Sequence, residues 1–349
     1  MGIGGVETGV RDLARYLNKK KINNYILSEK GRLNPEDKDL NIISLKNLRF
    51  KNPFHQIQIR KIIKYIIFKK GINLVHISSR APAFFLIDYI KKKGIKIVTS
   101  VHSEYKSDNF FKKIYNNSLL KGNLVIFNSK FTFKNHQNNL DKLPKYQIID
   151  RGIDLKYFKN NTKISNSNFR YIFLPGRPSV LKGHLTLINF FSKLLSSNKN
   201  LNYKLLLITS HQNRIEKKID DLIHSLNLIN RIEFVKPTLN IKKLYEKSYI
   251  VVSFSTRPEG FGRTISESLS MSKPIIATNL GGSREQLIKF DKKLLFQKNS
   301  YFSFKTAFDY VESNYKSISK KGRSFVKKYY SSENMCKKTL ESYLELIEN

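Results

Sequence analysis

Residues 250–277 have the sequence IVVSFSTRPEGFGRTISESLSMSKPIIA, which contains two short apolar runs separated by a loop and a helical pattern. The apolar runs, Ile250–Phe254 and Pro274–Ala277, have the length and composition of buried strands. Arg263–Ser270 lies between them and is expected to form a helix. A strand, a helix and a second strand joined in this way pair in parallel. The stretch therefore predicts a parallel sheet covered by helices.

The same alternation continues along most of the chain. In the first half we expect strands at 25–28, 42–45, 74–77, 96–99, 124–127 and 147–149, and helices at 8–20, 54–70, 82–93, 109–119 and 130–140. In the second half we expect further strands at 171–174, 204–209, 231–235 and 293–296, and helices at 183–195, 214–226, 241–247, 302–317 and 322–348. This order predicts an α/β fold with two doubly wound domains and a ligand-binding cleft between them.

A polar stretch at 154–168 interrupts the alternation and is the best candidate for a linker. We therefore expect an N-terminal domain at 1–160 and a C-terminal domain at 161–330. Residues 331–349 are expected to form a helix that packs back toward the N-terminal domain.

The composition excludes several classes of protein. Hydrophobic residues make up 40% of the 349 residues, with 24 Phe and 18 Tyr, which is too much for a disordered chain. The lone Cys336 excludes a disulfide scaffold and a cysteine-based zinc site. No apolar run approaches the ~18 residues that span a membrane. The first residues lack the apolar core of a signal peptide, so we expect a cytoplasmic protein.

The chain is strongly basic, with 64 Lys and Arg against 27 Asp and Glu and a net charge of +37. The charge is spread over both halves, whereas nucleic-acid-binding proteins usually concentrate it in a stripe or tail. The sequence also lacks an RNP, helix-turn-helix or zinc motif, so we expect no nucleic-acid partner. Residues 60–70, RKIIKYIIFKK, form a basic amphipathic stretch. An anionic membrane surface and an ordinary solvated helix both explain it.

Two glutamates flank the glycine-rich loop 258–262. Glu259 lies in the loop and Glu267 lies eight residues later, inside the expected helix. Glycines let backbone N–H groups approach a ligand closely, and a helix N-terminus attracts anions. The two carboxylates then suit the hydroxyls of a sugar and of a ribose. A plain strand–turn–helix with a capping glutamate is the alternative.

Three further segments place polar groups or glycines at the ends of expected strands or at the start of an expected helix. Arg177 and Lys182, in LPGRPSVLKGH (174–184), suit a diphosphate, although two surface cations explain them equally. Gly4 and Gly5 precede the first expected helix and leave room for a phosphate or sugar. His102, in TSVHSEY (99–105), is either structural or catalytic.

Together these segments resemble the retaining glycosyltransferases of family 4, which have the GT-B architecture of two Rossmann-like domains. The resemblance covers nearly the whole chain. It rests on GGVE (4–7), VHISSRAPA (75–83), TSVHSEY, DRGIDLKYF (150–158), PGRPSVLKG (175–183), RPEGFGRTISESL (257–269) and GGSRE (281–285). It is strongest to bacterial enzymes of lipopolysaccharide and surface-polysaccharide assembly.

The resemblance implies a role for each matching residue. Glu259 would bind the hydroxyls of the donor sugar and Glu267 the donor ribose. Arg177 and Lys182 would neutralise the leaving diphosphate, where negative charge develops. His102 would lie beside the reacting sugar. Backbone amides of Gly260, Phe261, Gly262, Arg263 and Thr264 would hold sugar and phosphate, with Gly4 and Gly5 on the phosphate side from the other domain.

The resemblance further implies a metal-independent reaction without a cofactor, in which a nucleotide-diphosphate sugar supplies the transferred group. The acceptor would be a glycolipid or a polysaccharide precursor, at or near the inner face of the cytoplasmic membrane. Asp37 and Asp39 form a D-x-D string, but they lie in a polar loop rather than after a strand, and we do not expect a metal there.

The sequence departs from the family pattern in three places. Met1 falls inside the Gly-Gly loop, so we expect the first β-strand of the N-terminal domain to be missing, through either a misassigned start or a lost strand. Asp150 replaces the usual proline before Arg151. Arg263 places a cation at a helix N-terminus, where we expect it to face an anionic group. An alternative function follows from the first departure: a catalytically impaired GT-B protein that binds nucleotide or a partner without turnover.

Overall fold

The structure is a computed structural model of the chain. It describes residues 4–29, 37–45, 53–105, 109–137, 144–161, 169–197, 202–209, 214–238 and 240–348. Most of the second half of the expected linker, residues 162–168, lies outside the described residues, as does the end of the helix expected at 130–140.

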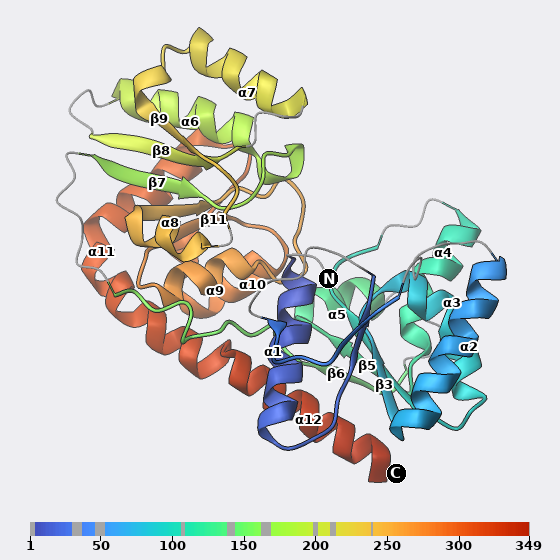
Figure 1. Ribbon diagram of the computed structural model, residues 1–349. Coiled ribbons are helices and arrows are strands. Elements are labelled where there is room, and N and C mark those ends of the chain that lie inside the picture. The colour runs from blue at the N-terminus through green and yellow to red at the C-terminus, as the bar shows by residue number, and fades with distance from the viewer. Residues whose placement is uncertain are drawn as a thin grey trace. The chain divides into compact units, whose positions relative to one another are not determined.

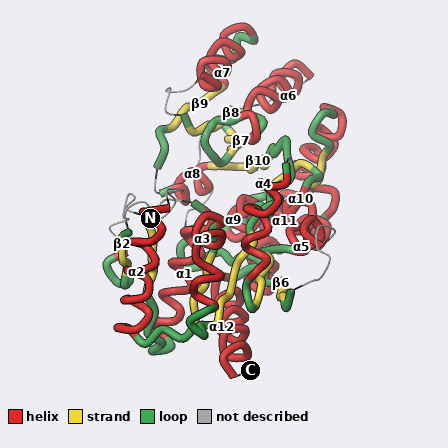
Figure 2. Tube along the Cα trace, turned by 90° about the vertical axis from the view of Figure 1, so that its right-hand side faces the viewer, coloured by secondary structure: helices red, strands yellow, loops and turns green. Residues whose placement is uncertain are grey.

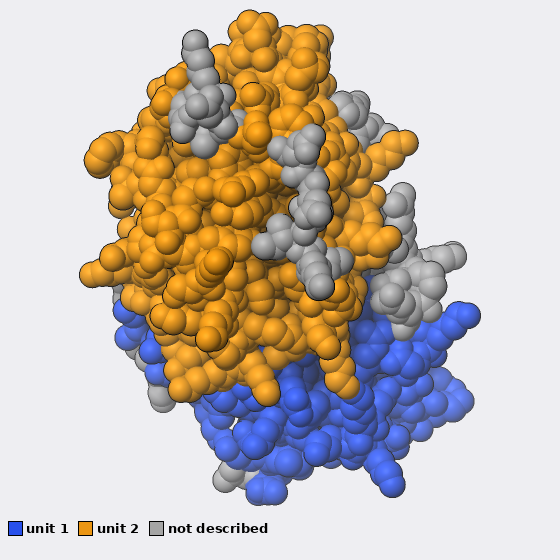
Figure 3. Space-filling model, turned by 90° about the vertical axis from the view of Figure 1, so that its left-hand side faces the viewer, with its two compact units in different colours: residues 1–152, 331–349 blue, residues 153–330 orange. Residues whose placement is uncertain are grey.

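The chain folds into two compact units (Figure 3). The first contains residues 1–152 and 331–349, and the second contains residues 153–330. The boundary therefore lies earlier than the expected one at 160. Ile153 and Phe158 are the physical reason, because both are buried in the core of the second unit. Ile153 N also donates a hydrogen bond to Tyr330 O, at 2.8 Å, within that unit.

The described residues of the first unit form two parallel sheets, one of two strands and one of four, in the orders β1-β2 and β3-β4-β5-β6. Its strands are β1 (Ile26–Ser28), β2 (Ile42–Ser44), β3 (Leu74–Ile77), β4 (Lys96–Val101), β5 (Leu124–Phe127) and β6 (Tyr146–Ile148). Its helices are α1 (Gly5–Lys19), α2 (Pro53–Lys70), α3 (Arg80–Lys91), α4 (Phe110–Asn117), α5 (Lys130–Gln137) and α12 (Ser332–Glu348).

Successive residues of β4 pack into different cores, because side chains alternate across a strand. Ile97 lies in the core that α2 and α3 complete, whereas Val98 lies in the core that α1 and α12 complete. Figure 2 shows α2 and α3 side by side in front of the sheet. The four-stranded sheet is thus covered on both faces, as the continuous apolar character of its central strands predicts.

In its described residues, the second unit has one parallel sheet of six strands in the order β12-β11-β10-β7-β8-β9 (Figure 1). Its strands are β7 (Arg170–Leu174), β8 (Tyr203–Ile208), β9 (Ile232–Val235), β10 (Ser248–Ser253), β11 (Ile275–Thr278) and β12 (Leu295–Phe296). Its helices are α6 (His184–Ser197), α7 (Arg214–Ser225), α8 (Ile241–Lys247), α9 (Arg263–Ser270), α10 (Gly281–Phe290) and α11 (Tyr301–Tyr329). The strand order reverses between β7 and β10, which is where ligands bind in open α/β sheets.

The α/β fold with parallel sheets in two domains is confirmed, and the strands and helices expected from the sequence are found in the described residues with small shifts at their ends. The sequence analysis expected no element at α10, which starts at Gly281 and Gly282. A glycine pair indicates a loop, but Gly281 has φ +54° and turns the chain into this helix. The helix expected at 302–317 extends to Tyr329 as α11, and α12 starts after a break at Tyr330. Within the described residues, no helix is both long and apolar enough to cross a membrane.

A buried polar contact links the sheet of the first unit to α12. His76 Nδ1 on β3 contacts Tyr343 Oη on α12, and His76 Nε2 lies 2.6 Å from Ser100 Oγ on β4. Burial, with a smaller contribution from Arg151, lowers the pKa of His76 from 6.5 to about 4. The imidazole is therefore neutral in the folded protein at pH 7.

We predict that acid weakens the fold through this histidine. Because the pKa of His76 is lower folded than unfolded, the unfolded state binds the proton first. The contribution of His76 to the free energy of unfolding is complete above pH 6.5. It declines as the pH falls toward 4, by at most ~1.4 kcal/mol per pH unit. Urea unfolding between pH 7.5 and 4.5 should show a shallower pH dependence for His76→Phe than for wild type. An unchanged pH dependence, equal to that of the exposed-site control His224→Phe, would contradict the prediction.

Candidate functional site

The loop 258–262 follows β10 and packs against the start of α10. Gly282 N donates a hydrogen bond to Glu259 O at 2.8 Å. Gly262 has φ +79°, and a Cβ atom at this position would lie 2.4 Å from Ser283 Oγ. The loop therefore requires glycine both for its backbone conformation and for the close approach of α10.

The loop 175–183 follows β7 and lies against the chain that follows β10. Thr256 N donates to Leu181 O at 2.9 Å. Gly183 has φ +63°, and a Cβ atom there would lie 2.4 Å from Phe254 O. The two loops that the sequence analysis singled out thus meet at the reversal of strand order, because β7 and β10 are paired neighbours.

Glu259 is held as an anion at this meeting point. Its Oε1 accepts a hydrogen bond from Lys182 Nζ at 2.7 Å and another from Ser255 Oγ. Burial opposes ionisation, but the charge and hydrogen bond of Lys182 and the hydroxyl of Ser255 outweigh it and lower the pKa of Glu259 below its usual value. An ionised carboxylate accepts hydrogen bonds and donates none, so Glu259 is suited to binding hydroxyl groups.

Glu267 is oriented by two neighbours on the same side of the sheet. Its Oε2 accepts from Tyr245 Oη at 2.8 Å, and its Oε1 accepts from Arg263 Nε at 3.1 Å. Burial, followed by the charge of Glu267, raises the pKa of Tyr245 well above 10, so the phenol remains a donor. Arg263 forms a salt bridge with Glu267, one turn further along α9.

Sequence analysis missed Ser255 and Tyr245. Ser255 follows β10 directly, but one hydroxyl after a strand is only a weak sequence signal for a functional site. Tyr245 lies on α8 and is fully buried. It can contact Glu267 because α8 precedes β10 and α9 follows it along the chain. Arg177 lies in the same loop as Lys182, and its side chain is exposed.

His102, Gly4 and Gly5 belong to the first unit. Gly4 precedes α1 and Gly5 begins it, and the Arg151 guanidinium donates to Gly5 O and, at 2.8 Å, to Val6 O. Arg151 therefore fixes the start of this helix from the chain that follows β6.

His102 follows β4, and both of its ring nitrogens are buried with no hydrogen-bond partner among the described residues. Burial, then Arg151 and His76, lower its pKa well below 6.5, so the ring is neutral. Asn128 Nδ2 donates to His102 O at 3.1 Å and holds the backbone at this point. A buried neutral imidazole with unused nitrogens offers one donor and one acceptor to a ligand, which supports a functional rather than a structural role.

The two carboxylates of the D-x-D string form salt bridges within the first unit. Asp37 pairs with Arg11 and Asp39 pairs with Arg15, each at 2.9 Å. Both carboxylates hold the loop to α1. In the described part of the chain, no three His, Cys, Asp or Glu side chains are grouped as a metal ion would require.

Comparisons with known proteins show the family of the chain. Residues 3–157 match the model of Glycosyltransferase Family 4, and residues 158–328 match that of Glycosyl transferases group 1. An uncharacterized glycosyltransferase of Methanocaldococcus jannaschii is 27% identical over 343 residues, which are 94% of this chain and 91% of that protein.

Solved structures extend the similarity over the full fold. A glycosyltransferase from Rickettsia africae is 32% identical with a TM-score of 0.86, over 99% of this chain and 96% of that one. Anabaena HepE in complex with UDP has a TM-score of 0.82 at 16% identity, over 98% and 96% of the two chains, and so shows the fold alone. The chain therefore belongs to the glycosyltransferases that combine a Family 4 domain with a group 1 domain, and its fold is GT-B.

Proposed function

We propose that this glycosyltransferase takes a sugar from a nucleotide-sugar donor and transfers it, with retention and without a metal ion, to a lipid-linked or surface-glycan acceptor. One observation carries the proposal: Glu259 is held as an anion by Lys182 where the loops after β7 and β10 meet. The structures of HepE with UDP and with UDP-glucose support a nucleotide-sugar donor for a chain of this fold.

The proposed roles follow from the charges and donors of the site. The ionised Glu259 accepts hydrogen bonds from the hydroxyls of the donor sugar, and Glu267 accepts from the ribose. Lys182, with Arg177, binds the diphosphate, because charge-assisted contacts to phosphate are strong. His102, in the first unit, is proposed to bind a hydroxyl of the reacting sugar or of the acceptor.

In the proposed reaction, the bond between the anomeric carbon and the diphosphate oxygen breaks, and its electron pair stays on the diphosphate. The acceptor hydroxyl forms the new bond on the same face of the sugar, and its proton passes to the departing phosphate oxygen. Lys182 stabilises the charge that develops there. No side chain has to act as the base, so Glu259 serves to bind the donor sugar.

We predict that Glu259→Gln slows transfer strongly. The amide keeps the size of the side chain but leaves Lys182 without its anion and weakens the bonds to the sugar. Loss of a charged hydrogen-bond partner is expected to lower the transfer rate about 10- to 100-fold. The rate is measured as the release of nucleoside diphosphate from the donor.

The matched control for this variant is Glu233→Gln, which removes another glutamate–lysine pair, with Lys247, from the same unit. We expect the control to transfer at the wild-type rate. Equal rates for Glu259→Gln and Glu233→Gln would contradict the role of Glu259.

We predict that one class of nucleotide sugar stabilises the protein. A ligand at ~100 times its Kd adds ~2.7 kcal/mol to the free energy of unfolding, which raises the Tm by several degrees. Thermal melting with UDP-, GDP- and ADP-sugars, each with and without EDTA, identifies the class. A shift that survives EDTA supports a metal-independent donor site. The absence of a shift with every sugar would overturn the proposal in favour of a protein that does not use a nucleotide sugar.

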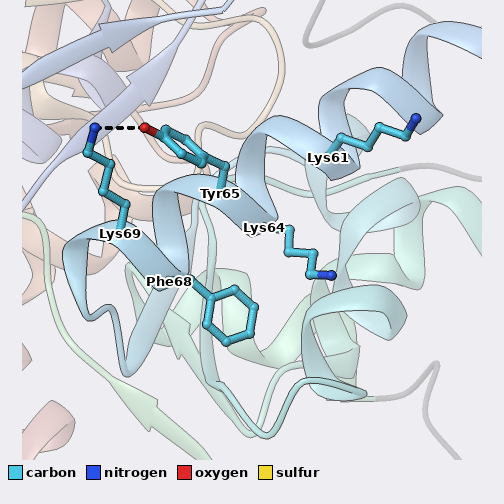
Figure 4. Close-up of a pocket in the computed structure, with 5 residues that line it drawn as sticks. All are labelled: Lys61, Lys64, Tyr65, Phe68 and Lys69. Atoms are coloured by element: carbon cyan, nitrogen blue, oxygen red, sulfur yellow. Dashed lines mark hydrogen bonds between the residues drawn. The ribbon is translucent and has the colours of Figure 1, made fainter.

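We further propose that α2 rests on an anionic membrane surface, where a lipid-linked acceptor would be found. Lys61, Lys64, Tyr65, Phe68 and Lys69 line a shallow hollow along this helix (Figure 4). Tyr65 and Phe68 are 59% and 66% exposed, and Lys69 Nζ donates to Tyr65 Oη at 2.7 Å. Exposed aromatic rings among lysines suit the interface of an anionic bilayer.

We predict that the chain floats with anionic liposomes and that salt releases it. Replacing Lys61, Lys64 and Lys69 together by Gln should weaken binding about 100-fold, since each lysine near such a surface contributes ~1 kcal/mol. The control replaces three exposed lysines of the second unit, Lys217, Lys218 and Lys320, by Gln. Equal binding of the two triple variants, or equal binding to neutral liposomes, would exclude docking through α2.

A further inference from the structure

Gln286, in the second turn of α10, joins three elements of the second unit through one amide. Its side chain is buried, with 1% of the residue exposed. Its Nε2 donates to Phe261 O at 2.5 Å and to Gly262 O at 3.1 Å. Its Oε1 accepts from Ser266 Oγ on α9, also at 2.5 Å. The amide therefore ties the loop 258–262 and the first turn of α9 to α10.

These bonds determine which way two peptide groups face. In a trans peptide, the C=O and N–H point in opposite directions. Because Gln286 draws Phe261 O and Gly262 O toward α10, the N–H groups of Gly262 and Arg263 point away from α10. Both N–H groups are among the backbone amides, 260–264, that the proposed function assigns to sugar and phosphate.

The loop needs such an anchor because glycine restricts its own backbone poorly. The side chain of Phe261 is fixed, since it is buried and packs edge-on against Tyr330, but a fixed ring leaves the adjacent peptide planes free to rotate. Gly282 N holds Glu259 O, at the other end of the loop. Between these points, the Gln286 amide donates to both carbonyls, and Gly262 O also accepts from Ile265 N at 3.1 Å.

We propose that Gln286 is a positioning residue for donor binding: it orients the N–H groups of Gly262 and Arg263 toward the diphosphate and sugar without contacting the donor. The proposal rests on the proposed function of the same site. It distinguishes the backbone N–H groups of Gly262 and Arg263, whose orientation depends on Gln286, from Glu267, which binds the ribose and is oriented by Tyr245 and Arg263.

The test compares a ligand that uses the amides with one that does not. UDP-glucose carries diphosphate and sugar, whereas uridine carries only the base and ribose; if another base is selected by thermal melting, the corresponding pair replaces them. Gln286→Met keeps the volume of the side chain and removes its donors. We expect Gln286→Met to bind UDP-glucose at least about tenfold more weakly than wild type and to bind uridine equally well, measured by calorimetry and by ligand-observed NMR.

Lys273→Met is the matched control. Lys273 is 4% exposed, and its Nζ donates to Glu246 O and Ser248 O, so this variant also leaves two backbone carbonyls of the same unit without their donor. We expect it to lower the Tm as Gln286→Met does and to leave both affinities unchanged. A purely structural role for Gln286 would make the two variants behave alike.

A second variant covers the case in which Gln286→Met does not fold. Gln286→Glu keeps an acceptor for Ser266 Oγ but turns a carboxylate toward the two carbonyls, so we expect a larger loss of UDP-glucose affinity, again without loss of uridine. Unchanged UDP-glucose affinity, or an equal loss for both ligands, would overturn the role of Gln286. If wild type binds no nucleotide sugar, the proposed function itself fails, which is a different result.

Discussion

The parallel pairing of β7 with β10 is the constraint on which the rest of the site depends. Val251 lies opposite Phe173, so the two strands end side by side although they are far apart in the sequence. Their following loops diverge toward opposite faces of the sheet, because the strand order reverses at this point. Lys182, in the loop after β7, and Glu259, in the loop after β10, form an ion pair between these two loops. Gly183 leaves no room for a side chain beside Phe254, which keeps the two loops in contact.

The carboxylates of the site are paired with cations: Glu259 with Lys182, and Glu267 with Arg263. Such pairs limit the cost of keeping carboxylates partly buried. In the proposed reaction, a nucleotide sugar brings hydroxyls for the carboxylates and phosphates for the cations. Binding then exchanges one set of charge-assisted bonds for another.

The hydrophobic periodicity of the sequence was sufficient for the strands and for the loops after β7 and β10, because buried parallel strands are short, apolar and separated by helices. It was insufficient where contacts between residues distant in the sequence determine the local structure. The glycines that begin α10 had no helical pattern, so the helix that carries Gln286 was missed. Tyr245 is far from Glu267 in sequence. Ile153 and Phe158 lie in a polar stretch of sequence, so their burial in the core of the second unit could not be predicted from their neighbours.

The first unit is built from two separate stretches of chain, with the whole of the second unit between them. Tyr343 of α12 contacts His76 of β3, and the residues around both belong to one unit. During synthesis the ribosome therefore releases β3–β6 long before α12 can cover them, while residues 153–330 are already complete. Of the two units, the second can finish folding first, and the face of the sheet that awaits α12 is the surface that a chaperone would have to protect.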